Sequence, residues 1–235
     1  MNPPVLYTQT LTRGAPSLSI VFEETDSAVS VQKPRTYTAT KRLLDIVFSV
    51  TGLTLTLPAA LLIMVCIKLE DGGPIFFTQD RWGEGGRVMK VYKFRTMTIH
   101  RTEHGRSIQA GSNDERITRV GRFLRSMSLD EVPQILNILK GEMSFVGPRS
   151  LSINEIQANE PLETRHTPDY EIPGFQLRLS VRPGLTGIAQ VCTPRTISRR
   201  HKFRYDNLYV RKRTLWLDMR LFVVSVGMAL TRKWK

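Results

Sequence analysis

The clearest feature of the hydrophobic pattern is an uncharged, largely apolar stretch that runs from Ile46 to Ile67. A helix of about 20 apolar residues is long enough to cross a bilayer. A buried helix of a soluble core can also be apolar, but it is rarely this long. The pattern therefore predicts a membrane-contacting helix over residues 41–70. Residues 1–40 lack the early apolar core of a signal peptide, and we expect a mobile extension or a short arm there.

Two features of this stretch bear on its path through a membrane. Pro58 lies near its middle, where proline removes a backbone hydrogen bond and kinks a helix. Lys41 and Arg42 precede the stretch and Lys68 follows it, and basic flanks favour the cytoplasmic side. A re-entrant helix that bends at Pro58 satisfies both flanks, whereas a kinked ordinary span is the alternative. In the re-entrant arrangement Asp45 needs a partner, and Arg42, one turn or less away, could pair with it.

Between residues 71 and 214 the pattern becomes mixed and predicts a polar domain of helices with one β-hairpin. Two short apolar runs at 75–77 and 88–92 predict the strands, and the glycine cluster at 83–86 predicts the turn between them. A helix is predicted over 133–140, because proline suits a first helical position and glycine the residue after the last. The predicted fold class is therefore α+β.

The last part of the chain, residues 215–235, contains a second apolar segment. Its apolar part is too short to cross a bilayer, and Arg232, Lys233 and Trp234 follow it. Basic and tryptophan anchors beside a short apolar face are typical of an interfacial amphipathic helix. A helix that packs on the protein core is the alternative.

The formal net charge of +13 predicts an anionic partner. Nucleic acid, anionic lipid and a phosphorylated substrate all qualify, and a solvated basic surface is the plain alternative. The basic segment 199–204 lacks a recognisable groove-reading or base-stacking module, so we expect no nucleic-acid partner. Cys66 and Cys192 provide neither a disulfide framework nor a zinc-site spacing, which fits a reducing compartment.

Candidate chemistry is concentrated at Asp130 and Glu131, just before the predicted helix at 133–140. Arg125 lies shortly upstream and Arg149 shortly downstream of this helix. A carboxylate among arginines suits phosphoryl transfer, because it can bind Mg²⁺ or attack phosphorus. The arginines would neutralise the charge that develops on the phosphoryl oxygens.

These polar residues also have structural interpretations. Ser128 and Glu131 have the spacing of a capping box, in which the two residues satisfy each other's backbone N–H groups. Pro133 weakens that interpretation, because its ring and missing N–H would conflict with the first turn. Lys93 and Arg95 point to the same face of an extended strand and could hold a diphosphate. A solvated strand edge presents such cations equally well.

Taken together, these segments resemble the bacterial sugar transferase family, the monotopic phosphoglycosyl transferases, over residues 41–230. Any one motif is weak, but so many motifs in this order are highly specific. The matching motifs are Lys41-Arg42-x-x-Asp45; Pro58 in the apolar segment; Gly73-Pro74-Ile75-Phe76-Phe77-Thr78-Gln79-Asp80-Arg81; Lys93-Phe94-Arg95-Thr96-Met97; Ser128-Leu129-Asp130-Glu131-Val132-Pro133-Gln134; Gly141-Glu142-Met143-Ser144-Phe145-Val146-Gly147-Pro148-Arg149; and Arg182-Pro183-Gly184-Leu185-Thr186-Gly187.

The resemblance implies a re-entrant helix broken at Pro58 in the bacterial inner membrane, with the catalytic domain facing the cytoplasm. It also implies ping-pong transfer in the first membrane step of exopolysaccharide or other glycoconjugate synthesis. Asp130 would attack the β-phosphate of a UDP-sugar, release UMP and carry the phosphosugar until polyprenyl phosphate takes it. Asp130 and Glu131 would bind Mg²⁺, or Glu131 would activate the acceptor. The expected substrate-binding residues are Lys93, Arg95, Arg125, Arg149 and Arg182.

The chain departs from the family pattern at two places. Ser150 replaces the proline that usually follows Pro148-Arg149, and Cys192-Thr193-Pro194 precedes Arg195, which comes one position late. The second departure bears on the identity of the donor, for which hexose and N-acetylated amino sugars both fit. The rival function is a non-catalytic basic scaffold on the membrane surface, which would explain the charge but not the acidic pair with its arginines.

Overall fold

The computed structural model of the protein describes residues 7–9, 20–22, 33–98, 107–108, 114–153, 155–156, 167–194 and 197–231. The chain divides into two compact units, Met1–Gln32 and Lys33–Lys235. In the first unit β1 (Tyr7–Gln9) pairs antiparallel with β2 (Ile20–Phe22). The rest of the predicted extension up to residue 32 lies outside the described residues. All other elements belong to the second unit.

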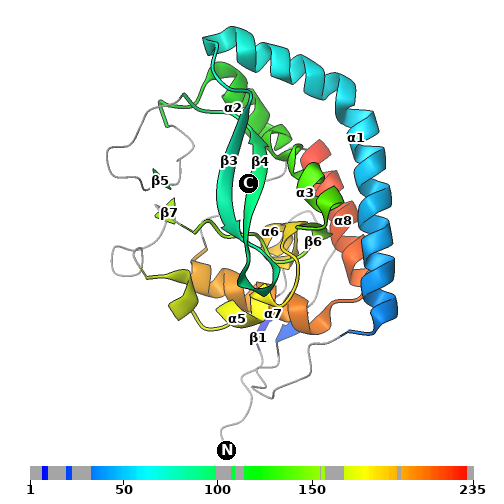
Figure 1. The fold of residues 1–235 in the computed structure, drawn as a ribbon. Coiled ribbons are helices and arrows are strands. Elements are labelled where there is room, and N and C mark those ends of the chain that lie inside the picture. Colours follow the sequence, from blue (N-terminus) through cyan, green and yellow to red (C-terminus); the bar gives the residue numbers. More distant parts are fainter. Residues whose placement is uncertain are drawn as a thin grey trace, which may run out of the picture. The chain divides into compact units, whose positions relative to one another are not determined.

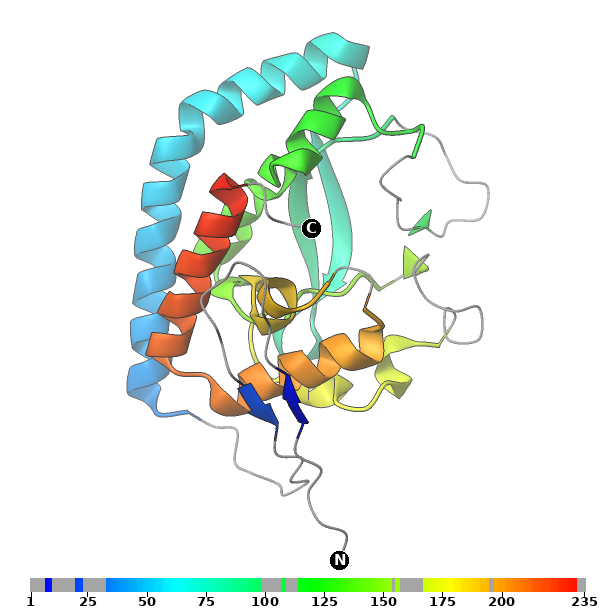
Figure 2. The same cartoon turned by 180° about the vertical axis from the view of Figure 1, so that it is seen from behind.

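The predicted apolar helix is α1, Arg35–Asp71, a continuous helix of 37 residues. It begins before residue 41, where we expected the helix to start. Pro58 lies inside α1, and the ribbon changes direction part-way along its length (Figures 1 and 2). The helix ends at Gly72, whose φ of 72° is left-handed and therefore suits glycine.

The two faces of α1 have different surroundings. On one face Asp45, Ser49 and Ile67 are buried against the rest of the unit. The opposite face leaves a row of large apolar side chains exposed: Leu43, Val47, Val50, Leu55, Leu57, Leu61, Leu62, Val65 and Leu69. Within the described part of the chain, α1 is the one helix that is long and apolar enough to cross a membrane.

The predicted hairpin follows α1 directly. Strand β3 (Phe76–Trp82) pairs antiparallel with β4 (Val88–Phe94), from Phe76 opposite Phe94 to Trp82 opposite Val88. The turn is the short 3₁₀ helix η1 (Glu84–Gly86), in which Gly85 and Gly86 have positive φ. The sequence therefore predicted this hairpin and its glycine turn correctly.

The first core joins the end of α1, the hairpin and the next helices. These helices are α2 (Arg119–Ser126), η2 (Leu129–Glu131) and α3 (Gln134–Lys140). Ile67, Phe94 and Leu124 form the buried centre of this core. Partly buried side chains from α1, including Ala60 and Met64, pack against it. The second half of α1 is thus bound to the domain along its buried side.

A second core lies among the later elements. Strand β6 (Ser144–Val146) pairs parallel with β8 (Gly184–Thr186), and β5 (Ser107–Ile108) pairs parallel with β7 (Glu155–Ile156). The helices are η3 (Asp169–Glu171), α5 (Phe175–Leu179), α6 (Ile188–Cys192) and α7 (Arg199–Lys212). Phe175 and Phe203 are buried together here with Ile172 and Leu179. The unit is thus a mixture of helices and two-stranded sheets.

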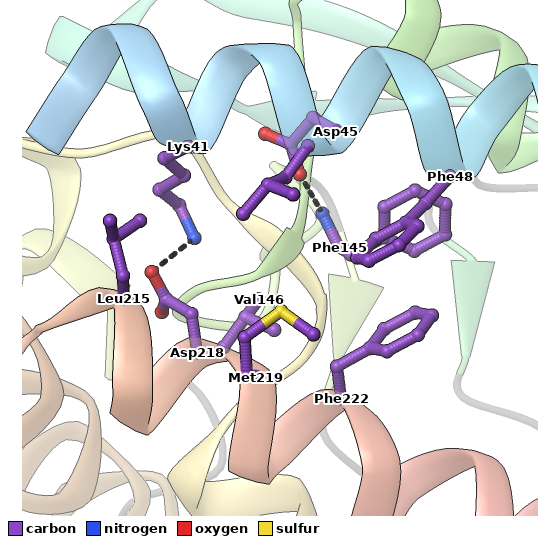
Figure 3. A pocket seen from close by; sticks show the side chains of 10 residues that line it. Lys41, Asp45, Phe48, Phe145, Val146, Leu215, Asp218, Met219 and Phe222 are labelled. Carbon is purple, nitrogen blue, oxygen red and sulfur yellow. Dashed lines mark hydrogen bonds and ion pairs between the residues drawn. The ribbon is translucent and has the colours of Figure 1, made fainter.

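The last helix, α8 (Leu215–Leu230), lies alongside the first half of α1 (Figures 1 and 2). Leu221 is 1% exposed on its packed face, whereas Trp216 is 77% and Val223 is 63% exposed. Phe222 stacks on Phe48 of α1 with ring centroids 4.8 Å apart (Figure 3). The helix therefore packs on the core with one face and leaves apolar side chains exposed on another.

The expected pairing of Arg42 with Asp45 is wrong. Arg42 instead donates to the carbonyl oxygens of Ile138 and Leu139, at 2.6 and 2.7 Å, and so caps the end of α3. The last carbonyls of a helix have no partner within the helix and attract cations. Asp45 accepts from the Oγ of Ser144 at 3.0 Å. It also accepts from the backbone N–H of Phe145 at 3.1 Å (Figure 3). Partners from distant parts of the chain replace the local pair.

Asn137 joins α3 to the hairpin and is fully buried. Its Oδ1 accepts from the backbone N–H of Tyr92, and its Nδ2 donates to the carbonyl of Lys90 and to a carboxylate oxygen of Glu142. These bonds tie β4, which carries Lys93, to the helix that follows the acidic pair. Asn137 therefore fixes the spacing between the two segments.

Replacing Asn137 with alanine is expected to lower the free energy of unfolding by about 2–4 kcal/mol, because buried backbone groups of β4 lose their partners. Denaturant titration of the protein in detergent micelles would measure this loss. Arg122→Ala, at an exposed position of α2, is the control. A loss for Asn137→Ala no greater than that of the control would contradict the prediction.

Candidate active site

Lys93, Asp130 and Glu131 come together where the end of β4 meets η2. The Nζ of Lys93 lies 2.7 Å from Oε1 of Glu131 and 3.7 Å from Oδ2 of Asp130. The two carboxylate side chains are only 14% and 19% exposed. A single ammonium group thus bridges two adjacent, mostly buried carboxylates.

The backbone before the acidic pair makes an abrupt turn at Ser128. Ser128 has a φ of 56° and is the one non-glycine residue with positive φ among the described residues. Its side chain makes no capping hydrogen bond, and Glu131 points to Lys93 instead of back to Ser128. The capping-box interpretation is therefore wrong. Helix α3 starts at Gln134 with Pro133 just before it, one residue later than predicted.

The two carboxylates differ in their electrostatic surroundings. Burial alone would raise the pKa of Glu131, but Lys93 and Arg149 outweigh it and hold that pKa well below its usual range. Burial raises the pKa of Asp130, and the neighbouring charge of Glu131 adds to this effect. Lys93, Arg125 and Arg149 oppose the rise. Glu131 is thus a stable anion, whereas the ionised form of Asp130 depends on the surrounding cations.

Two of the predicted arginines lie at this site. An NH2 nitrogen of Arg149 is 3.2 Å from Oε1 of Glu131, and the Arg149 side chain is 47% exposed. Arg125 donates through Nε to Oγ1 of Thr96 at 2.9 Å, which anchors its guanidinium near Asp130. Cations therefore approach the acidic pair from β4, from α2 and from the segment after β6.

Arg95 and Arg182 have other partners. Strand β4 ends at Phe94, and the guanidinium of Arg95 forms a bidentate ion pair with Asp71 at the end of α1. Arg182 lies 3.4 Å from a carboxylate oxygen of Glu84 in the hairpin turn. The structure thus does not place either residue against the acidic pair, although both were expected to bind substrate.

An apolar groove begins next to the acidic pair. It has a volume of about 320 Å³ and lies between α1, the hairpin and the start of α3. Leu57 and Met64 of α1 line one side, and Phe76, Phe94 and Leu136 line the other. Val132 and Pro133, which directly follow Glu131, also line it. The site therefore has a charged part and an adjoining apolar part.

Arg81 is a residue of this region to which the sequence assigned no role. It is 9% exposed, donates through NH1 to the carbonyl oxygen of Ser150 at 2.7 Å, and helps to lower the pKa of Glu131. The sequence did contain a sign that Arg81 matters, because Arg81 ends one of the motifs that resemble the family. Its partner could not be predicted, because the carbonyl of Ser150 lies far along the chain and no local pattern links the two residues. The replacement of the usual proline by Ser150 leaves this contact possible, because the acceptor is a backbone carbonyl, which proline also has.

The thiol of Cys192, the last residue of α6 and the first of the unusual segment, is not reactive at neutral pH. Burial raises the pKa of Cys192 to about 11, so its thiol stays protonated. Arg195 lies outside the described residues. The chemistry of the region therefore centres on the two carboxylates and their cations, an arrangement that can bind and attack a phosphoryl group.

Comparison with known proteins agrees with this site. A family model described as bacterial sugar transferase matches residues 36–232. The chain belongs to the bacterial sugar transferase family. The sequence-based resemblance is thereby confirmed, and the matched region includes all of α1 but its first residue, the acidic pair and α8.

Several proteins with curated names are similar to the chain. A UDP-glucose:undecaprenyl-phosphate glucose-1-phosphate transferase of Klebsiella pneumoniae is 42% identical over 79% of this chain and 39% of the relative. A UDP-N-acetylgalactosamine-undecaprenyl-phosphate N-acetylgalactosaminephosphotransferase of Aeromonas hydrophila is 37% identical over 83% and 44%. The exopolysaccharide production protein PSS of Rhizobium leguminosarum bv. phaseoli is 38% identical over 82% and 96%. The chain therefore spans less than half of the first two relatives and nearly all of the third.

Proposed function

We propose that the protein transfers a sugar 1-phosphate from a UDP-sugar to polyprenyl phosphate and releases UMP. The observation that carries this proposal is the pair Asp130–Glu131, mostly buried, bridged by Lys93 and approached by Arg149. The names of the relatives support the two substrates, undecaprenyl phosphate being the polyprenyl acceptor that they share. Both glucose and N-acetylgalactosamine occur as donor sugars in these names.

The proposed reaction has two displacements at phosphorus. In the first, a carboxylate oxygen of Asp130 bonds to the β-phosphorus of the UDP-sugar, and the bond from that phosphorus to the bridging oxygen breaks. UMP leaves with the electron pair, and the phosphosugar stays on Asp130. In the second, an oxygen of polyprenyl phosphate attacks the same phosphorus and frees the Asp130 carboxylate. Lys93, Arg125 and Arg149 would neutralise the phosphoryl oxygens in both steps.

Mg²⁺ fits the donor set of Asp130 and Glu131. Mg²⁺ prefers oxygen ligands and is usually bound by one or two carboxylates together with substrate phosphates. We propose these two residues as its protein ligands. When bound, the ion would supply additional positive charge to the phosphate oxygens. The strong preference of Glu131 for its ionised form suits this role.

The apolar groove suits the isoprenoid part of the acceptor. Its lining continues directly from Glu131 through Val132 and Pro133, so a phosphate at Lys93 and Arg149 would leave the adjoining chain among apolar side chains. Burial of this chain would add hydrophobic binding energy. Leu57 belongs both to the groove lining and to the exposed apolar row of α1, so the groove adjoins that row.

The attachments of α1 support a re-entrant path, with both ends on the cytoplasmic side. Near its start Arg42 binds α3, and at its end Glu70 accepts from the backbone N–H of Arg119 in α2 at 2.6 Å. A helix that crossed the bilayer would place its two ends on opposite sides, yet here both ends bind one domain. The exposed apolar rows of α1 and of α8, with Trp216, would then face lipid.

Single cysteines can test this topology. Cys66 and Cys192 would first be replaced by serine, and Thr40→Cys or Thr78→Cys would then be introduced, because Thr40 in α1 and Thr78 in β3 both have exposed side chains. A membrane-impermeant maleimide is expected to label both positions from the cytoplasmic side only. Val65→Cys, on the exposed apolar row, is the control and should be protected from both sides. Labelling of Thr40→Cys and Thr78→Cys from opposite sides would exclude the re-entrant path.

The proposed function itself is tested with UDP-glucose and UDP-N-acetylgalactosamine. The purified protein should release UMP from one of them without acceptor, in an amount no greater than the enzyme present, and turn over when undecaprenyl phosphate is added. EDTA should stop both reactions and Mg²⁺ restore them. A non-catalytic scaffold would release no UMP, and a direct transfer would release it only once the acceptor was present.

A further inference from the structure

The segment that carries Arg149 is fixed through its backbone. The N–H of Gly184 donates to the carbonyl oxygen of Pro148 at 2.8 Å, and the N–H of Gly147 donates to the carbonyl of Thr186 at 2.8 Å. Arg81 holds the carbonyl of Ser150. Neighbouring residues on both sides of Arg149 are thus held by hydrogen bonds. The carbonyl oxygen of Arg149 itself accepts from a side chain.

That side chain is Arg178 of α5, which is 3% exposed. Its NH2 donates to the carbonyl oxygen of Arg149 at 2.6 Å. The same guanidinium donates to Oδ2 of Asp206 in α7, from NH2 at 2.7 Å and from Nε at 3.2 Å. Its central carbon lies 4.4 Å from the ring centroid of Phe203. Arg178 is therefore held by charge and by packing on an aromatic ring.

A buried ion pair of this kind gives little net stability, because its desolvation cost offsets its attraction. Arg178 makes a third bond, to the carbonyl oxygen of Arg149, and through this bond the Arg178–Asp206 pair can hold the Arg149 backbone in place. The side chain of Arg149 is long and nearly half exposed. The position of its guanidinium therefore depends on the position and orientation of its backbone. Small displacements of a group that contacts the reacting atoms cost large factors in rate.

We propose that Arg178 and Asp206 are positioning residues, which hold the backbone of Arg149 so that its guanidinium lies against Glu131. Neither side chain contacts the acidic pair, and both act through Arg149. The inference rests on the proposed function for its kinetic consequence, but its structural claim concerns only where Arg149 lies.

The test replaces the pair as a unit, because removing one partner would leave an uncompensated buried charge. The variant is Arg178→Met with Asp206→Leu, and a denaturant titration would verify that it folds. UMP formation is expected to fall by about 10- to 100-fold. In an Arg149→Ala background the same double change should cost less than about twofold further, because residues that act through one another are not additive. The matched control is Arg199→Met with Asp169→Leu, which removes another ion pair involving α7.

A second readout does not depend on activity. The rate at which phenylglyoxal modifies Arg149, measured by peptide mass spectrometry, should rise several-fold in the Arg178/Asp206 variant and stay unchanged in the control. An unchanged modification rate would overturn the positioning role. So would a double change that reduces UMP formation by the same factor in the Arg149→Ala background as in the wild-type protein. If the wild-type protein releases no UMP, the proposed function fails, and the modification rate still decides the structural claim.

Discussion

Replacing Asp130 with asparagine is expected to reduce UMP formation by about three orders of magnitude or more. Asparagine keeps the shape of the side chain but cannot act as an anionic nucleophile and is a poorer ligand for a hard cation. Phosphosugar from a labelled donor should remain on the wild-type protein after denaturation and be absent from Asp130→Asn. Initial rates of UMP release and mass spectrometry of the intact protein would measure the two effects.

Ser128→Ala is the control for this variant. Ser128 precedes the acidic pair closely, and its side chain makes no capping hydrogen bond, so its loss should leave turnover near the wild-type value. Glu131→Gln should also impair turnover, because it removes the more strongly ionised carboxylate. Normal turnover by Asp130→Asn, or equal damage by Ser128→Ala, would show that Asp130 is not the nucleophile.

Replacing Lys93 with methionine is expected to lower the rate by about 10²- to 10³-fold, the usual cost of losing one positioned charge at a developing anion. It should also change the pH dependence. Lys93 opposes the rise that burial causes in the pKa of Asp130, so its removal raises that pKa further. The ionised nucleophile then forms only at higher pH, and the acidic limb of the pH–rate profile should shift to higher pH.

Lys90→Met provides the matched control, since Lys90 lies on the same strand at an exposed position. It removes the same charge and should change neither the rate nor the acidic limb by more than about twofold. The pH profile of single-turnover UMP release would distinguish the two variants. An acidic limb that stays in place in Lys93→Met would show that Lys93 does not set the ionisation of Asp130.

The elements that depend on local pattern could be predicted from the sequence. The apolar run around Pro58 gave α1, the glycine cluster gave the hairpin turn, and Pro133 with Gly141 bounded α3. The start of α1 at Arg35 was missed, because the polar residues before Lys41 continue the helix without any apolar signal. Local pattern thus fixes the kind of element better than its ends.

Contacts made by charged side chains were predicted less well, because proximity in sequence is a poor guide to their partners. Arg42 and Asp45 lie on the same helix, yet each binds a segment about a hundred positions away. Lys93 reaches the acidic pair, whereas Arg95 turns to Asp71 because the strand ends between them. The positive φ of Ser128 sets the direction of the backbone that carries the acidic pair. It could not be predicted from the sequence, because serine rarely adopts this conformation.

The polar attachments of α1 also determine when the chain can complete its fold. The backbone groups that bind Arg42 and Asp45 follow them by 96 to 100 positions, and the Asp218 carboxylate follows Tyr37 by 181. Synthesis from the N-terminus therefore produces α1 long before its partners. During that interval its charged first turns must be solvated by water or headgroups, and contacts of such sequence separation form late. Helix α1 can therefore complete its native contacts only after the ribosome has synthesised α8.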